Sequence, residues 1–133
     1  MMMFKTSPML SKNSVLLIGA ILCALAVAIG AFGAHGLSAI LEHNDRVDTF
    51  LLANRYQFYH GLSLLFIGAR YEFSVTLEKV MALALFLGVL IFSGSLYCLA
   101  TTDIRWFGAI APIGGTLLLI GWTSLVVTIA RNR

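Results

Sequence analysis

Long, mainly apolar stretches alternate with more polar segments along this chain. Four such stretches cover 15–34, 50–70, 80–100 and 106–130. Each has about the 20 residues that an α-helix needs to cross the hydrocarbon core of a bilayer. The segments between them are short, so consecutive helices are expected to run antiparallel. The pattern predicts an all-α fold, an integral membrane four-helix bundle that forms one transmembrane domain over 1–133.

The segment 37–53, between the first two stretches, has a different pattern. Its apolar residues recur at steps of three or four, and charged or polar residues fill most positions between them. The apolar residues are Leu37, Ile40, Leu41, Val47, Phe50 and Leu51. This spacing predicts an amphipathic helix on the membrane surface, between the first and second spans. The pattern is interrupted near Asn44, which leaves open a turn between two shorter helices.

The first stretch also has an alternative interpretation. Its apolar beginning, followed by the small-residue triplet Ala24-Leu25-Ala26, resembles a cleaved signal peptide. The apolar run continues for eight residues beyond Ala26. This extra length favours a transmembrane helix that is not cleaved.

Composition narrows the class of protein. The 133 residues are 59% hydrophobic and 11% charged, whereas soluble domains average about 25% charged residues. This composition argues against a water-soluble monomer, and the lipid bilayer is the expected partner. The basic residues are scattered and form no stripe of the kind that binds nucleic acid, so no nucleic-acid partner is expected. Cys23 and Cys98 each stand alone in an apolar stretch, which predicts two buried, reduced cysteines.

The positions of the basic residues predict the orientation in the membrane. On one side of the predicted spans lie six of them, Lys5, Lys12, Arg70, Lys79, Arg131 and Arg133. On the other side lie three, Arg46, Arg55 and Arg105. Because cytoplasmic segments carry the excess of Lys and Arg, both termini are predicted to lie in the cytoplasm.

Several polar side chains are predicted to lie within the bilayer, between its middle and its outer face. At about 1.5 Å per helical residue, His60 lies roughly 15 Å from the cytoplasmic end of its helix. The candidate polar intramembrane cluster consists of His35, Arg55, Tyr56, Gln57, His60, Ser93, Ser95, Tyr97 and Pro112. In one interpretation these groups hydrogen-bond across the bundle and fix its packing. In the other they line a functional site or pathway, as ionisable residues inside spans do by default.

Small residues gather near the outer ends of the first and fourth predicted helices. Glycine allows helix backbones to approach closely in a membrane, so these positions are predicted to be helix-packing faces. They are Gly30, Gly33, Gly36, Gly114 and Gly115. Pro112 is expected to kink the fourth helix and to free a carbonyl near Gly108.

The sequence provides no recognisable catalytic constellation. All six acidic residues fall in predicted loops or in the surface segment, and no pair of histidines with a carboxylate has the spacing of a zinc site. No catalytic residue, metal site or cofactor is therefore predicted. Haem ligation by His60 would need His35 as its partner, and the two histidines are predicted to differ in depth by several helical turns.

Four ordered motifs resemble a known family. They are GAFGAHGL at 30–37, YQFYHGLSLL at 56–65, FSGSLY at 92–97, and PIGG at 112–115 followed by Gly121-Trp122. Their order and spacing resemble the YgdD-like family of small bacterial inner-membrane proteins. The resemblance implies a four-span protein of the bacterial inner membrane whose biochemical activity is not established. One departure is Ala111, where the family pattern often has threonine.

Three hypotheses of function follow. The first is a non-enzymatic helical bundle that self-associates or assembles with a larger membrane protein through its glycine faces. The second is a transporter or channel for a small solute or protons, with a polar cavity in the outer half of the bilayer. Its cavity would contain Arg55, Gln57, His60, Ser95 and Tyr97. The third is a redox protein that holds haem or quinone near His35 and His60.

Overall fold

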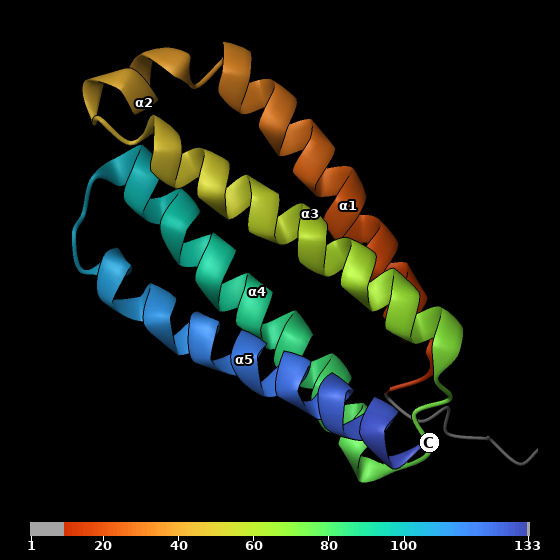
Figure 1. Ribbon diagram of the computed structural model, residues 1–133. Coiled ribbons are helices and arrows are strands. Elements are labelled where there is room, and N and C mark those ends of the chain that lie inside the picture. The colour runs from red at the N-terminus through yellow and green to blue at the C-terminus, as the bar shows by residue number, and fades with distance from the viewer. Residues whose placement is uncertain (1–9, 133) are drawn as a thin grey trace, which may run out of the picture.

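The protein is all-α in the computed structural model, which describes residues 10–132. Its helices are α1 (Lys12–His35), α2 (Ser38–His43), α3 (Val47–Arg70), α4 (Thr76–Thr102) and α5 (Phe107–Arg131). The four long helices alternate in direction, as Figure 1 shows. One end of the molecule therefore holds the start of α1 and the end of α5, and we call it the terminal end. The opposite end holds α2, and we call it the α2 end.

Each of the four apolar stretches forms one long helix, with boundaries within four residues of those predicted. Local chemistry sets the ends. The Ser11 hydroxyl accepts a hydrogen bond from the Ser14 backbone N–H and caps the start of α1. At the end of α4, Asp103 takes a left-handed conformation with φ of 53°, which stops the helix and begins the turn into α5.

The polar segment after α1 is divided by a turn. Helix α2 ends at His43, and α3 begins at Val47. The interruption near Asn44 is therefore a turn between two helices, and the segment is not one continuous helix. The Asn44 side-chain amide donates to the carbonyl oxygen of Ala100 over 3.0 Å. This bond satisfies one of the last carbonyls of α4, which have no partner inside their own helix.

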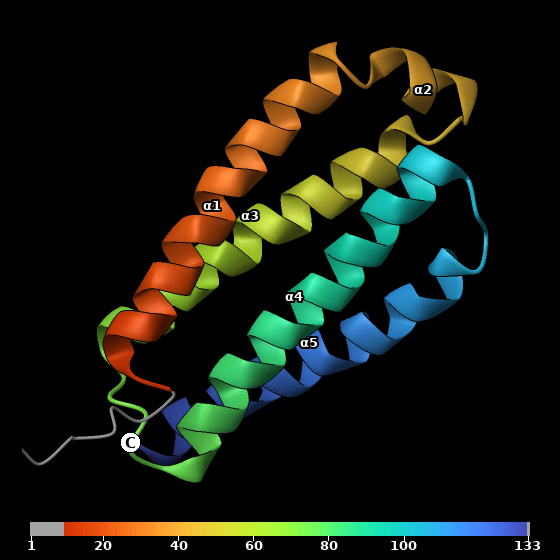
Figure 2. The same ribbon diagram turned by 180° about the vertical axis from the view of Figure 1, so that it is seen from behind.

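The long helices pack as an open row and not as a closed four-helix bundle. In the described residues, extensive packing joins α1 to α3, α3 to α4, and α4 to α5. The same order, α1, α3, α4, α5, is visible from both sides in Figure 1 and Figure 2. A closed bundle would also pack α1 on α5. The row leaves α1 and α5 as edge helices, each with one long neighbour, and places α3 and α4 in the interior.

Three of the described helices are long and apolar enough to cross a membrane, namely α1, α4 and α5. Helix α3 has 24 residues, a length that would suffice, but it is not among the three. Asn54, Arg55, Gln57 and His60 lie in its first half and middle and reduce its apolar character. The predicted number of four spans is therefore not supported by apolar character and length alone.

Glycine allows α1 and α3 to approach at their backbones. A Cβ atom added at Gly19 would lie 2.8 Å from the carbonyl oxygen of Gly61 and 2.9 Å from the backbone nitrogen of Leu65. A Cβ atom added at Gly61 would lie 3.0 Å from the backbone nitrogen of Cys23. These atoms belong to the main chain and cannot move aside, so the contact between α1 and α3 requires glycine at both positions.

The contact between α4 and α5 has the same basis. A Cβ atom at Gly114 would clash with the backbone nitrogen of Phe92 and lie 2.7 Å from the carbonyl oxygen of Gly88. Gly121, seven residues later on the same face of α5, has Leu85 of α4 within 2.6 Å of the equivalent atom. The row therefore contains two glycine-dependent contacts, one on each side of the pair α3 and α4.

The structure places the other glycines of the predicted packing faces in varied surroundings. Gly30 faces the side chain of Asn54, and Gly33 is covered by the ring of Phe50, both on α3. Gly36 faces Phe32 of its own helix. Gly115 has open space around it, with Phe92 at 3.9 Å from the added atom.

Among residues 10–132, one ion pair lies at each end of the molecule. At the terminal end, Lys12 Nζ lies 3.1 Å from Glu72 Oε1. At the α2 end, Arg46 Nε lies 3.0 Å from Asp103 Oδ1. All four side chains are partly or largely exposed, so these pairs stabilise the fold only slightly. They join segments that are far apart in the sequence.

The two cysteines differ from the prediction. Cys23 is half-buried, and its thiol lies 3.8 Å from the carbonyl oxygen of Phe58 on α3. Cys98 is exposed on the surface of α4. The prediction of two buried cysteines was wrong for Cys98, because the apolar stretch around it belongs to a helix with one face outside the packed core.

We predict that Gly114→Ala destabilises the protein by about 1–3 kcal/mol, since the new methyl group meets the backbone of α4 and forces the helices apart. The measurement is unfolding in detergent micelles, followed by circular dichroism. Gly94→Ala on α4 is the matched control, because nothing lies within 4 Å of its added atom. That control is expected to be neutral or stabilising by up to about 1 kcal/mol, because alanine favours a helix over glycine. Equal stabilities for the two variants would contradict the backbone contact.

Candidate functional site

Four polar side chains lie together in the interior of the row, and we call them the α3 polar network. Asn54, Tyr97 and Gln57 are joined to one another by hydrogen bonds, and Ser93 lies one turn before Tyr97 on α4 and bonds to the backbone of α3. Asn54 and Gln57 lie three residues apart on α3 and therefore point to similar sides of that helix. Ser93 and Tyr97, four residues apart on α4, face them. The network joins the interior pair of helices to the edge helix α1.

The two amides of α3 bind the backbone of α1. The side-chain nitrogen of Asn54 donates to the carbonyl oxygen of Ala26 over 2.7 Å. The side-chain nitrogen of Gln57 donates to the carbonyl oxygen of Leu22, one turn away, over 3.0 Å. Each carbonyl has a second lone pair beyond the one that its own helix uses. Helix α3 is thus attached to α1 at two successive turns.

Tyr97 completes the network on the side of α4. Its hydroxyl donates to Gln57 Oε1 over 2.6 Å and accepts from the Asn54 side-chain nitrogen over 3.1 Å. Beside it, the Ser93 hydroxyl donates to the carbonyl oxygen of Ala53 over 2.8 Å. Gln57 and Ser93 are 5% and 3% exposed. Because water hardly reaches such buried side chains, each of these groups needs a partner in the protein.

His60 joins α3 to the far edge helix. The indole N–H of Trp122 on α5 donates to His60 Nε2 over 3.1 Å. An acceptor nitrogen carries no proton, so the proton of the neutral ring is on Nδ1, which lies 2.7 Å from the carbonyl oxygen of Tyr56. Both ring nitrogens of His60 are therefore engaged within the chain. The two rings meet edge to face, with centroids 5.8 Å apart.

The remaining members of the predicted cluster lie outside this network. Arg55 is exposed on the outer surface of α3, and Pro112 is exposed within α5, which continues through it. The Ser95 hydroxyl donates to the carbonyl oxygen of Phe92 in its own helix over 3.0 Å. Tyr56 is half-buried, with its ring 4.6 Å from that of Phe92 between centroids.

His35 and His60 are too far apart to share a haem. His35 is the exposed last residue of α1, at the α2 end. His60 lies thirteen residues into α3 from that end, which corresponds to about 20 Å along the helix axis. The described residues also contain no group of three His, Cys, Asp or Glu side chains placed to hold a metal ion. Joint ligation of a haem by these two histidines is therefore ruled out by the fold.

The row has shallow grooves on both faces. One groove of about 430 Å³ lies between α3 and α5, and Tyr56, His60, Phe92 and Trp122 are among its lining residues. Another, of about 150 Å³, lies between α1 and α4, and Gln57, Ser93 and Tyr97 line part of it. The five residues of the predicted transport cavity are thus divided between grooves and surfaces and do not share one cavity.

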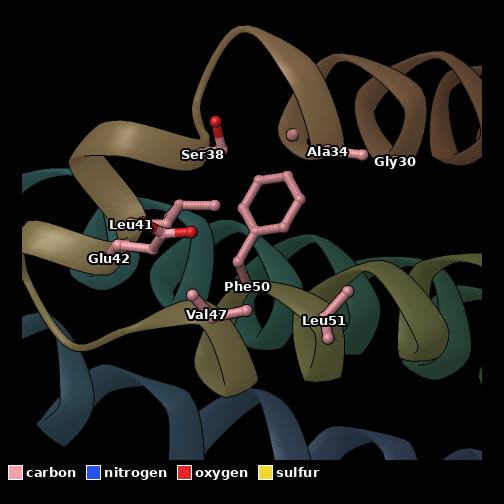
Figure 3. A pocket seen from close by; sticks show the side chains of 9 residues that line it. Gly30, Ala34, Ser38, Leu41, Glu42, Val47, Phe50 and Leu51 are labelled. Atoms are coloured by element: carbon pink, nitrogen blue, oxygen red, sulfur yellow. The ribbon is translucent and has the colours of Figure 1, made fainter.

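A third pocket lies at the α2 end. Figure 3 shows it between the end of α1, α2 and the start of α3, with the ring of Phe50 pointing into it. The carboxylate of Glu42 and the hydroxyl of Ser38 are the polar groups at its edge, and the rest of the lining is apolar. Phe50 also contacts Tyr97 edge to face, with centroids 5.3 Å apart. The pocket therefore borders the α3 polar network without opening into it.

Sequence reasoning missed two members of these contacts. Asn54 is absent from the predicted polar cluster, although its position three residues before Gln57 places it on a related face of the helix. Trp122 is the partner of His60 and lies 62 residues away in the sequence. No periodicity within one helix identifies such a pair, because it depends on which helices become neighbours in the row.

We predict that Tyr97→Phe lowers the free energy of unfolding by about 1 kcal/mol, because Gln57 Oε1 and the Asn54 amide both lose a partner in a water-free interior. Ser95→Ala is the control, since its hydroxyl bonds only within α4. The control is expected to change stability by less than about 0.5 kcal/mol. Unfolding of both variants in the same micelles measures the difference. A Tyr97→Phe protein as stable as the control would contradict a stabilising network.

Comparison with known proteins places the chain among membrane proteins of unknown function. A family model described as "Protein of unknown function (DUF423)" matches residues 29–115, which include all of α2, α3 and α4. A UPF0382 membrane protein of Staphylococcus epidermidis is 45% identical over 112 residues, 84% of this chain and 91% of the relative. No solved structure shows a significant match.

Relatives in other bacteria have the same family name. The UPF0382 membrane protein YwdK of Bacillus subtilis is 35% identical over 118 residues, 87% of this chain and 95% of its own length. A UPF0382 membrane protein of Haemophilus influenzae is 40% identical over 116 residues, 86% of this chain and 91% of its own length. The sequence similarity to these relatives thus extends over most of this helical protein. The chain belongs to the DUF423 family of UPF0382 membrane proteins, whose function is unknown.

Proposed function

We propose that this protein is a non-catalytic membrane scaffold, a row of four transmembrane helices that self-associates or assembles with a larger membrane protein. The observation that carries the proposal is how the interior polar groups are used. No buried side-chain nitrogen or oxygen among the described residues lacks a hydrogen-bond partner. The amides, the imidazole and the tyrosine hydroxyl are committed to holding helices together, which supports a role in packing over one in chemistry or transport.

Helix α3 crosses the membrane with the other three in this proposal. It packs along α1 from Gly68, which faces Leu16, to Phe50, which covers Gly33. It therefore shares the depth of α1 over most of its length. Helices α1 and α4 run in the same direction, so the chain must return between them, and α3 is the segment that returns (Figure 1). Internal hydrogen bonds compensate for its polar residues.

We propose that the terminal end faces the cytoplasm and the α2 end faces outward, in a bacterial inner membrane. The basic residues support this orientation. Among the described residues, the terminal end carries Lys12, Arg70, Lys79 and Arg131. The motifs GAFGAHGL and YQFYHGLSLL support the narrower assignment to the YgdD-like group.

The edge helices are the assembly surfaces in this proposal. The glycine contacts face inward and join neighbouring helices of one chain, so they are not free for a partner. On the outside, Phe32 of α1 and Leu119 of α5 are 60% and 69% exposed. Each edge helix has one long neighbour within the chain. A second protein that packs on α1 or α5 would extend the row.

The first test is the position of α3. We predict that cysteines introduced as His43→Cys and Ser74→Cys, in a chain with Cys23→Ala and Cys98→Ala, react with a membrane-impermeant maleimide from opposite sides. In intact spheroplasts His43→Cys is labelled, and Ser74→Cys is labelled only after permeabilisation. The two positions flank α3 and are both exposed. Labelling of both from one side would show that α3 does not cross the membrane.

The second test is assembly. We predict that benzoylphenylalanine at Phe32 or Leu119 yields a photo-cross-linked adduct of higher mass in living cells, because the edge helices contact protein. The same probe at Phe66 of α3 is the control, since Phe66 is 58% exposed but lies in the middle of the row. Adducts are detected on denaturing gels and identified by mass spectrometry. Monomer alone at both edge positions would mean that the edges contact only lipid and would contradict the scaffold proposal.

A further inference from the structure

Arg55 and Asp48 form an unusual pair of charges on the outer surface of α3. Both side chains are exposed. Neither takes part in the two ion pairs found among residues 10–132. Seven residues separate them, so they lie about 10 Å apart along the axis and within roughly 20° of the same direction around it. The two opposite charges therefore stand one above the other on the same face of the helix.

Asp48 and Arg55 lie at different positions along the axis of α3. Asp48 is in the first turn of α3, at the α2 end, while Arg55 lies about 12 Å along the helix from Val47. Side chains of a helix lean toward its N-terminus. The long side chain of Arg55 can therefore reach back toward the α2 end, as basic side chains near helix ends commonly do. The carboxylate lies nearer the surface, and the guanidinium lies below it.

An apolar groove begins at Arg55. It has a volume of about 280 Å³ and lies between α1 and α3, with a lining of Ala26, Val27, Asn54, Arg55, Phe58 and Tyr59. The polar nitrogen of Asn54 is already used by Ala26 and Tyr97. The feature is thus an apolar groove on the surface, with the positively charged side chain of Arg55 at its edge. Its shape suits a hydrocarbon chain whose polar head lies at Arg55.

We infer that this face of α3 binds a phospholipid whose headgroup contains a primary amine, that is, a phosphatidylethanolamine. The phosphate binds the guanidinium of Arg55 by charge-assisted hydrogen bonds. The ammonium group, which lies farther out than the phosphate, pairs with the carboxylate of Asp48. One acyl chain occupies the groove beside Phe58 and Tyr59. The inference rests on the transmembrane position of α3 that is proposed above.

This order of charges distinguishes between headgroups. An anionic headgroup without an amine, such as that of phosphatidylglycerol, would pair with Arg55 but place its glycerol beside the carboxylate of Asp48. A choline headgroup offers a cation but no N–H donor for that carboxylate. Inorganic phosphate would use Arg55 and leave the groove empty. Selectivity for the amine thus distinguishes this site from one in which Arg55 alone attracts any phosphate group.

The test is native mass spectrometry of delipidated protein titrated with phosphatidylethanolamine in a mild detergent. We expect Arg55→Gln and Asp48→Asn each to weaken binding roughly tenfold, which corresponds to the loss of one charge-assisted contact. Arg105→Gln is the control, because Arg105 is also an exposed arginine at the α2 end, and it should bind as the unchanged protein does. Circular dichroism of each variant verifies that the fold is kept.

Two results would overturn the inference. One is binding of phosphatidylethanolamine that is unchanged in Arg55→Gln. The other is equal binding of phosphatidylglycerol, phosphatidylcholine or inorganic phosphate by the unchanged protein, which would remove the role of the amine. The maleimide labelling at His43→Cys and Ser74→Cys reports separately on whether α3 crosses the membrane. Loss of lipid binding with that labelling pattern intact therefore rejects the lipid site alone.

Discussion

The exclusion of water from the interior of the row is the constraint on which this fold depends. Helix α3 carries two amides and an imidazole in its middle turns, and when buried each must find a partner in the protein. Asn54 and Gln57 bind backbone carbonyls of α1, and Tyr97 of α4 completes their bonding. His60 takes the indole proton of Trp122 from α5. The least apolar long helix thus contacts all three of the others.

This arrangement explains why an open row is held together. Close glycine packing joins α1 to α3 at Gly19 and Gly61 and α4 to α5 at Gly88 and Gly114. Hydrogen bonds of the α3 polar network add to the contacts of α3 with α1 and α4. The bond between His60 and Trp122 extends from α3 to the helix beyond α4 and so links two helices that are not neighbours in the row. The edges of the row remain available to lipid or to another protein. The relatives are named membrane proteins, and a row of long helices is an architecture that suits a membrane protein.

Much of the fold follows from local patterns in the sequence. Mainly apolar stretches predicted the four long helices, and the interruption near Asn44 indicated the turn before α3. The order of packing was not predictable in this way, since it depends on contacts between distant segments. Gly115 looked equivalent to Gly114, yet one faces open space and the other faces the backbone of α4. Arg55 looked like part of the polar interior, although its position around the helix places it outside.

This fold requires that the interior polar side chains of α3, Asn54, Gln57 and His60, are bonded within the protein and not to water or to a ligand. Water-edited solid-state NMR of the protein in lipid bilayers, with ¹⁵N-labelled side chains, measures this directly. We expect no transfer from water to the side-chain nitrogens of Gln57 and His60, with the imidazole neutral and its Nε2 unprotonated. Rapid transfer from water to these nitrogens, or a proton on Nε2 of His60, would contradict it and would favour a hydrated pathway through the row.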